Sequence, residues 1–135
     1  MPSLKTTQRK RKILIVDDDP DLIYLLQRLV QLVGFDFIVA TNGNQAVDIA
    51  TAQLPDLITM DIMLPKMDGL EATRLIRQNP KTRSIPIMAV TASRSFKDKQ
   101  KCLATGFDDY LAKPFTSSQL ASHIETLLMQ PATSP

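Results

Sequence analysis

The chain has 135 residues, 44% hydrophobic and 22% charged, which suits one folded domain with a buried core. No apolar run approaches the ~18 residues of a membrane-spanning helix, and the single cysteine excludes an internal disulfide. The net charge of +2 hides a basic N-terminus, because residues 1–12 carry five basic side chains and no acid. We therefore expect a cytoplasmic protein that does not enter a membrane, with a basic disordered tail over 1–11, one domain over 12–130 and a second tail over 131–135.

Five apolar runs alternate with five helical patterns along the chain. The apolar runs have the length and residue types of buried strands and cover residues 13–16, 37–40, 57–60, 85–90 and 110–112. Strands that alternate with helices form a parallel sheet covered on both faces, because each crossover returns the chain to the same edge. The sequence therefore predicts a single α/β domain.

Helix start and stop signals separate these strands. An acid, a hydroxyl or a small amide residue begins each of several helices, and a glycine or a proline-containing turn ends them. The residues that carry these signals are Asp19, Pro20, Gly34, Asn42, Gly43, Asp68, Glu71, Asn79, Pro80, Gly106, Thr116 and Gln119.

Four of the five predicted strands end in, or are followed by, a chemically useful side chain. In chain order these are Asp17 with Asp18, then Asp61, Thr91 and Lys113. All strands of an open parallel sheet point the same way, so these ends share one edge, where ligands bind beside the strand at which the winding reverses. We expect the five side chains to line one crevice.

Three carboxylates in one crevice repel each other by about 4 kcal/mol per pair at ~4 Å and a typical effective dielectric constant. The site must therefore hold protons or a cation. Oxygen ligands with little nitrogen or sulfur suit a hard ion such as Mg²⁺, and that ion with Lys113 would attract a phosphoryl group.

Each of these residues also has a purely structural interpretation. Asp17 to Asp19 are a common type of helix-capping cluster, threonine is common at strand ends, and lysine is usually a solvated surface charge. We interpret His123 and Cys102 as structural, because neither has a catalytic partner in the sequence, and Asp108-Asp109 as turn residues. The prediction of a site depends on the joint placement of its members.

The sequence resembles the receiver domain of two-component response regulators, of the single-domain, CheY-like kind. The stretches that carry the resemblance are residues 13–19, 60–69, 90–92 and 110–115, in the order and spacing of that family. The similarity extends over residues 12–130. It implies a flavodoxin-like, doubly wound, five-stranded parallel sheet with strand order 2-1-3-4-5 and five helices.

The resemblance also implies roles for the crevice residues. Asp61 would accept a phosphoryl group from a histidine kinase or a histidine phosphotransfer protein. Mg²⁺ would be bound by Asp18, Asp61 and the backbone carbonyl of Met63, with Asp17 acting through water.

Lys113 would pair with the phosphoryl oxygens, and Thr91 would move to hydrogen-bond one of them. Tyr110 occupies the family's aromatic switch position, and the Lys113-Pro114 bond is expected to be cis. The output face would be formed by the fourth helix, the fifth strand and the fifth helix.

Such a chain is not an enzyme in the ordinary sense: it would catalyse only its own phosphorylation and slow self-dephosphorylation. We expect no DNA-binding domain within the chain and an unknown downstream protein partner, and dimerisation through the output face stays open. One alternative is a receiver fragment of a larger regulator or hybrid histidine kinase. Another is an aspartyl-phosphate phosphatase of the haloacid dehalogenase type that uses Asp17, against which the chain's length and Pro20 both argue.

Overall fold

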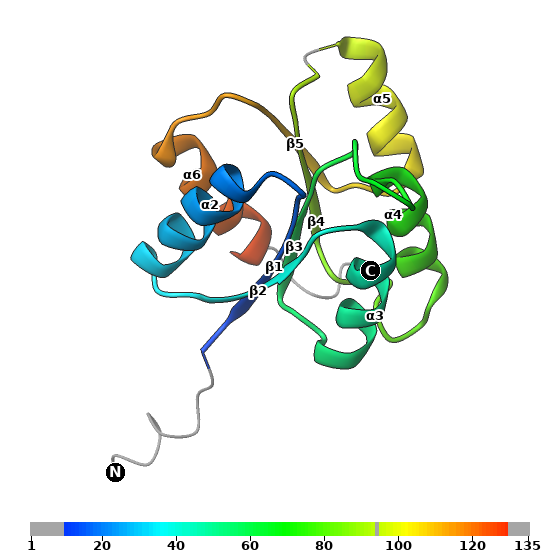
Figure 1. Ribbon diagram of the computed structural model, residues 1–135, viewed down its shortest axis with the longest axis horizontal. Coiled ribbons are helices and arrows are strands. Elements are labelled where there is room, and N and C mark those ends of the chain that lie inside the picture. The colour runs from blue at the N-terminus through cyan, green and yellow to red at the C-terminus, as the bar shows by residue number, and fades with distance from the viewer. Residues whose placement is uncertain (1–9, 94, 130–135) are drawn as a thin grey trace.

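A parallel sheet of five strands forms the centre of the computed structural model, which describes residues 10–93 and 95–129 (Figure 1). The strand order is β2-β1-β3-β4-β5, which confirms the predicted doubly wound arrangement. The strands are β1 (Lys12–Val16), β2 (Asp36–Ala40), β3 (Leu57–Met60), β4 (Ile87–Thr91) and β5 (Asp109–Ala112). The predicted tails fall mainly on residues 1–9 and 131–135, outside the described residues.

Five helices cover the two faces of the sheet (Figure 1). They are α2 (Pro20–Leu32), α3 (Gly43–Gln53), α4 (Gly69–Gln78), α5 (Phe96–Thr105) and α6 (Ser117–Met129). Among the described residues, no helix combines the length and the apolar character needed to cross a bilayer.

Alternating side chains of the strands separate the core into two layers. In β1, Ile13 and Ile15 pack with α2 and α6, whereas Leu14 and Val16 pack with α3, α4 and α5. A strand places successive side chains on opposite faces, so an all-apolar strand such as β1 supplies both layers. This double burial explains why the central strands read as continuous apolar runs and not as alternating ones.

Side-chain caps begin the helices where the sequence predicts them. Asp19 accepts a hydrogen bond from the Asp21 N–H, and Asp68 accepts one from the Glu71 N–H. Thr116 and Gln119 form the predicted reciprocal capping box at the start of α6. Each cap satisfies a backbone donor that the first turn of a helix leaves without a partner.

The predicted fourth strand begins too early. Strand β4 starts at Ile87, because Pro86 has no N–H and the carbonyl of Ile85 accepts a hydrogen bond from Arg77. The same guanidinium donates to the carbonyl of Gly106 and to Asp108. Arg77 therefore ties α4 to the segments that precede β4 and β5, a long-range contact that the local pattern does not reveal.

Two fully buried threonines give opposite predictions for stability. The hydroxyl of Thr59, in the middle of β3, has no hydrogen-bond partner among the described residues, whereas that of Thr82 donates to the Ile76 carbonyl at 2.7 Å. We predict that Thr59→Val raises the free energy of unfolding by about 1 kcal/mol, because valine removes a hydroxyl that was desolvated without compensation. Thr82→Val should lower it by about 1–2 kcal/mol, because the buried Ile76 carbonyl loses its 2.7 Å hydrogen bond and keeps the longer one, of 3.4 Å, from the Asn79 N–H. Urea unfolding of both variants tests this, and shifts of equal sign would contradict it.

Candidate functional site

The carboxyl ends of β1, β3, β4 and β5 meet at one edge of the sheet (Figure 1). Ladder bonds continue one residue past the strands: the Asp61 N–H donates to the Val16 carbonyl at 2.9 Å, and the Lys113 N–H donates to the Thr91 carbonyl at 2.8 Å. The backbones that carry the predicted site residues are therefore fixed by the sheet itself. This edge includes the point between β1 and β3 where the winding direction reverses.

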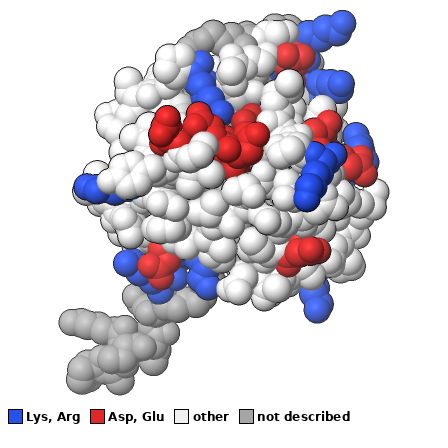
Figure 2. Space-filling view, viewed as in Figure 1, with Lys and Arg blue, Asp and Glu red and all other residues white. Residues whose placement is uncertain are grey.

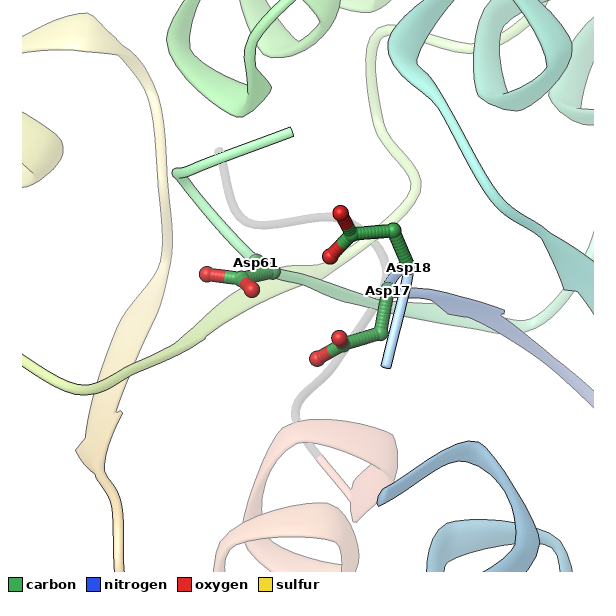
Figure 3. A group of neighbouring side chains, drawn as sticks. All are labelled: Asp17, Asp18 and Asp61. Carbon is green, nitrogen blue, oxygen red and sulfur yellow. The ribbon is translucent and has the colours of Figure 1, made fainter. Parts of the chain in front are cut away.

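Three carboxylates come together at this edge. Asp17, Asp18 and Asp61 each offer an oxygen, and these oxygens all lie within 4.8 Å of one another. Figure 3 shows the three side chains extending from the ends of β1 and β3 toward a common space. Asp17 and Asp61 are buried, with 1% and 6% of their surface exposed, whereas Asp18 is exposed. The predicted convergence of the acids is confirmed.

Lys113 connects two of these acids. Its Nζ lies 3.1 Å from Oδ2 of Asp17 and 3.3 Å from Oδ2 of Asp61. The other oxygen of Asp61 accepts a hydrogen bond from the Met63 N–H at 3.2 Å, and that of Asp17 accepts one from the Asp19 N–H at 3.0 Å. The two buried carboxylates are thus held by one ammonium and two backbone donors.

These surroundings shift two protonation equilibria. Burial raises the pKa of Asp61, and the charge of Asp17 adds to this effect, although Lys113 and the Met63 N–H oppose it. Burial alone would lower the pKa of Lys113, but its bonds and charge interactions with Asp17 and Asp61 outweigh burial and raise it. The amine therefore stays protonated while the Asp61 carboxylate is ionised at a cost in free energy.

The residues present fit a hard divalent cation. Three ionised carboxylates carry three negative charges, and in the described part of the chain only Lys113 forms a salt bridge with any of them. Two negative charges remain, which equals the charge of a divalent ion. The donors are oxygens, and exposed Asp18 leaves the site open to solvent, as Mg²⁺ prefers because it keeps several waters.

Two glycines hold the loop that follows Asp61. The Gly69 N–H donates to the Ile62 carbonyl at 2.9 Å, and the Gly43 N–H donates to the Met67 carbonyl at 3.1 Å. A Cβ at Gly69 would lie 2.2 Å from the Asp61 carbonyl oxygen, and one at Gly43 would lie 2.2 Å from the Met67 carbonyl oxygen. Only glycine permits these approaches. The sequence shows Gly43 merely as part of a turn, so its contact with the loop was missed.

The predicted switch residues lie next to the same site. Thr91 is 1% exposed and lines one cleft together with Asp18 and Met63. Tyr110 donates a hydrogen bond of 2.5 Å from its hydroxyl to the carbonyl of Ser93, two residues beyond Thr91. The Lys113-Pro114 peptide bond is cis.

The residues interpreted as structural lie away from the carboxylates. Cys102 is buried against the core, and burial raises the pKa of its thiol. His123 has a partner that the sequence did not reveal: its Nδ1 lies 2.5 Å from Asp109, the first residue of β5. Asp109 is therefore part of a strand and not of a turn, whereas Asp108 precedes the strand and binds Arg77.

The sequence matches the family described as response regulator receiver domain over residues 13–125. The chain belongs to this family. The match covers most of the chain and includes every residue of the site. It gives no support to the alternative of a haloacid dehalogenase-type phosphatase.

Relatives and solved structures agree with this assignment. The chain is 38% identical over 118 residues to the alkaline phosphatase synthesis transcriptional regulatory protein PhoP of Bacillus subtilis, covering 87% of this chain and 48% of PhoP. It is also 38% identical to an uncharacterised 14.6 kDa protein of Leptolyngbya boryana, covering 84% of this chain and 87% of that one. The receiver domain of the sensor histidine kinase PA1611 of Pseudomonas aeruginosa, solved with magnesium in its active site cleft, superposes with a TM-score of 0.85 at 35% identity, covering 90% of this chain and all of that one. The chain thus spans about half the length of regulators such as PhoP.

The raised pKa of Asp61 predicts a pH-dependent gain in stability for Asp61→Asn. An acid whose pKa is raised in the folded chain destabilises it wherever the folded carboxylate is ionised, that is, above the raised pKa. The cost falls as the pH drops through that pKa and is absent below the ordinary value of 3.8, where both states are protonated. Without divalent ions, Asp61→Asn should therefore unfold at higher urea than the wild type at pH 7, and the gain should vanish near pH 3.

Exposed Asp48 on α3 supplies the matched control, and Asp48→Asn should show no such gain at pH 7. An Asp61→Asn protein less stable than the wild type at pH 7, or a gain that persists at pH 3, would contradict the conclusion that ionised Asp61 destabilises the folded chain.

Proposed function

We propose that this receiver domain accepts a phosphoryl group on Asp61 from a phosphohistidine of a histidine kinase or a histidine phosphotransfer protein. The observation that carries the proposal is the pairing of buried Asp61 with both Lys113 and two further carboxylates at the end of the sheet. The family assignment and the resemblance to the magnesium-bound PA1611 receiver domain support it.

The residues supply positioning and charge more than covalent help, as phosphoryl transfer requires. An oxygen of Asp61 forms the new bond to phosphorus, and the bond from phosphorus to the histidine nitrogen breaks with its electron pair kept by the imidazole. The Met63 N–H holds one oxygen of Asp61, so the attacking carboxylate has one defined orientation. Lys113 lies within reach of the other oxygen and offers its ammonium to the transferred group.

Mg²⁺ would be held by Asp18, Asp61 and the backbone carbonyl of Met63, with Asp17 acting through water. When bound, the ion neutralises charge on the carboxylates and the phosphoryl oxygens. Asp17 also keeps Lys113 in place through its 3.1 Å contact. Asp17 is therefore both an outer participant in ion binding and a positioning residue for the amine.

A phosphoryl group on Asp61 adds negative charge and hydrogen-bond acceptors at the sheet edge. The Thr91 hydroxyl has no hydrogen-bond partner within the described residues and is free to donate to it. A movement of Thr91 would also move the Tyr110 hydroxyl, because that hydroxyl donates a hydrogen bond to the carbonyl of Ser93, two residues after Thr91. These two residues would bias the surface of α5, β5 and α6, the predicted output face for an unknown protein partner.

We predict that acetyl phosphate with Mg²⁺ adds one phosphoryl group to the chain, at Asp61. Intact-protein mass spectrometry with peptide mapping measures the addition. Lys113→Ala should slow it by roughly 100-fold, because one preorganised donor to the transferred group is lost. Asp61→Asn should show no addition, and Asp48→Asn should react like the wild type. A mass increase that survives Asp61→Asn would assign the chemistry to another residue.

We also predict one Mg²⁺ site that depends on Asp18. Titration calorimetry should give a dissociation constant about tenfold or more weaker for Asp18→Asn, because the number of ligand charges sets the affinity of such sites. Asp21, an exposed acid in the first turn of α2, provides the control, and Asp21→Asn should bind like the wild type. Equal affinities for Asp18→Asn and Asp21→Asn would remove Asp18 from the site.

A further inference from the structure

A cleft of about 950 Å³ opens between the loop after β3 and helix α5. One end of the cleft is the carboxylate site, where Asp18 and Thr91 line it. The other end reaches the buried side chain of Cys102. This volume is at the upper end of the range for ligand sites and is too large for one side chain. Helix α5 supplies Asp98, Lys101 and Cys102 to this lining and β5 and α6 supply none, so the cleft borders the predicted output face and shares only α5 with it.

Apolar side chains form one wall of this α4–α5 cleft. Met63 and Pro65 are exposed, whereas Ile62, Leu64 and Leu70 are half-buried and also pack against the core. Met63 has 76% of its surface in contact with solvent. Grouped exposed apolar side chains beside polar ones mark interaction sites.

The charged side chains of the cleft select the occupant. Among the described residues, Asp18, Asp68 and Asp98 line it together with one ammonium group, that of Lys101. Asp68 and Asp98 are fixed by hydrogen bonds from the Glu71 N–H and the Ser93 hydroxyl, so their charges do not swing away. Figure 2 shows a group of acidic side chains on this side of the molecule, with Lys or Arg side chains beside it. An acidic occupant would be repelled, whereas a basic one would be attracted.

The α5 wall is the more lightly packed of the two helices that flank the cleft. Cys102 is its one buried residue among those whose side chains the structure describes, whereas α4 buries four residues. A helix with one buried side chain can shift to fit a bound segment at a smaller free-energy cost than a helix with several buried side chains.

We propose that the α4–α5 cleft is a docking groove for a partner-protein segment in which apolar side chains are flanked by Lys or Arg. The apolar side chains would cover the wall of the β3–α4 loop, and the basic ones would face Asp68 and Asp98. The groove between α2 and α6 offers no such selection, because none of its lining residues is charged. One part rests on the proposed function: a phosphoryl group on Asp61 adds negative charge at the end of the cleft, so binding should tighten.

Three short peptides separate the contributions: acetyl-Arg-Leu-Leu-Arg-amide, the same peptide with Glu for Arg, and the same peptide with Ser for Leu. Backbone amide shifts of the full chain locate binding. Alkylation of Cys102, the single cysteine, by N-ethylmaleimide gives a second readout, because this buried thiol reacts only when α5 opens locally and an occupant that packs against α5 opposes that opening. Only the Arg-Leu peptide should shift cleft amides and slow alkylation appreciably. Equal binding of the Glu peptide, or shifts centred on the α2–α6 groove, would overturn the proposal.

Charge variants give a second test with opposite signs. Asp98→Lys should weaken binding of the Arg-Leu peptide about two- to tenfold, and Lys101→Glu should strengthen it by a similar factor, whereas Asp48→Lys on α3 should leave it unchanged. If all three variants bind alike, the cleft is not the site.

Repeating the titration with acetyl phosphate and Mg²⁺ tests the dependence on phosphorylation. Tighter binding in the wild type but not in Asp61→Asn supports it, and equal binding to a fully phosphorylated chain contradicts it. If no phosphoryl group is added, the proposed function fails, while the peptide preferences of the unmodified chain still decide the docking proposal.

Discussion

The repulsion among Asp17, Asp18 and Asp61 is the constraint on which the rest of the site depends. At separations below 5 Å such charges cost several kcal/mol unless something compensates them. The fold compensates with one lysine and two backbone N–H groups, and that falls short of neutrality by two charges. The deficit is useful, because a fully compensated site would attract neither a divalent ion nor a phosphoryl group. Under the proposed function, the stability that the domain forgoes at this edge is what would make Asp61 reactive.

The two uncompensated negative charges can persist because hydrogen bonds of the sheet hold the backbone of the acidic residues in place. Asp61 cannot retreat, since its N–H is bonded to β1 and the loop after it is held by Gly43 and Gly69. Both glycines stand at helix N-termini, so each of the two helices also directs its first N–H group at a loop carbonyl. The loop is therefore fixed at three points within nine residues. A carboxylate on a flexible tip would relax the repulsion by moving apart from its neighbours.

Much of this arrangement is readable from the sequence, and what is not readable has a common physical cause. The strands, the caps at Asp19, Asp68 and Thr116, and the convergence of the acids follow from local patterns and from the direction of parallel strands. The contacts of Arg77, Gly43 and His123 do not, because each joins segments whose separation only the packed structure sets. The early start predicted for β4 has the same origin. Ile85 reads as strand, and a guanidinium from α4 holds its carbonyl outside the ladder.

Helix α5 connects the carboxylate site at the sheet edge to the surface of the domain. Its two ends are held by different kinds of contact. At the C-terminal end, Arg77 donates to the Gly106 carbonyl and to Asp108, far from the carboxylates. At the N-terminal end, Asp98 accepts from the Ser93 hydroxyl, and the Ser93 carbonyl in turn accepts from Tyr110.

Ser93 follows Thr91 by two residues, so under the proposed function a movement of Thr91 would act first on the N-terminal turn of α5. That turn carries Asp98, which lines the cleft, while Tyr110 belongs to β5 and so to the predicted output face. A change at the site would therefore reach both sides of one lightly packed helix, whose C-terminal end is held by Arg77. A helix buried along its whole length would resist such a change, since every shift would break core contacts.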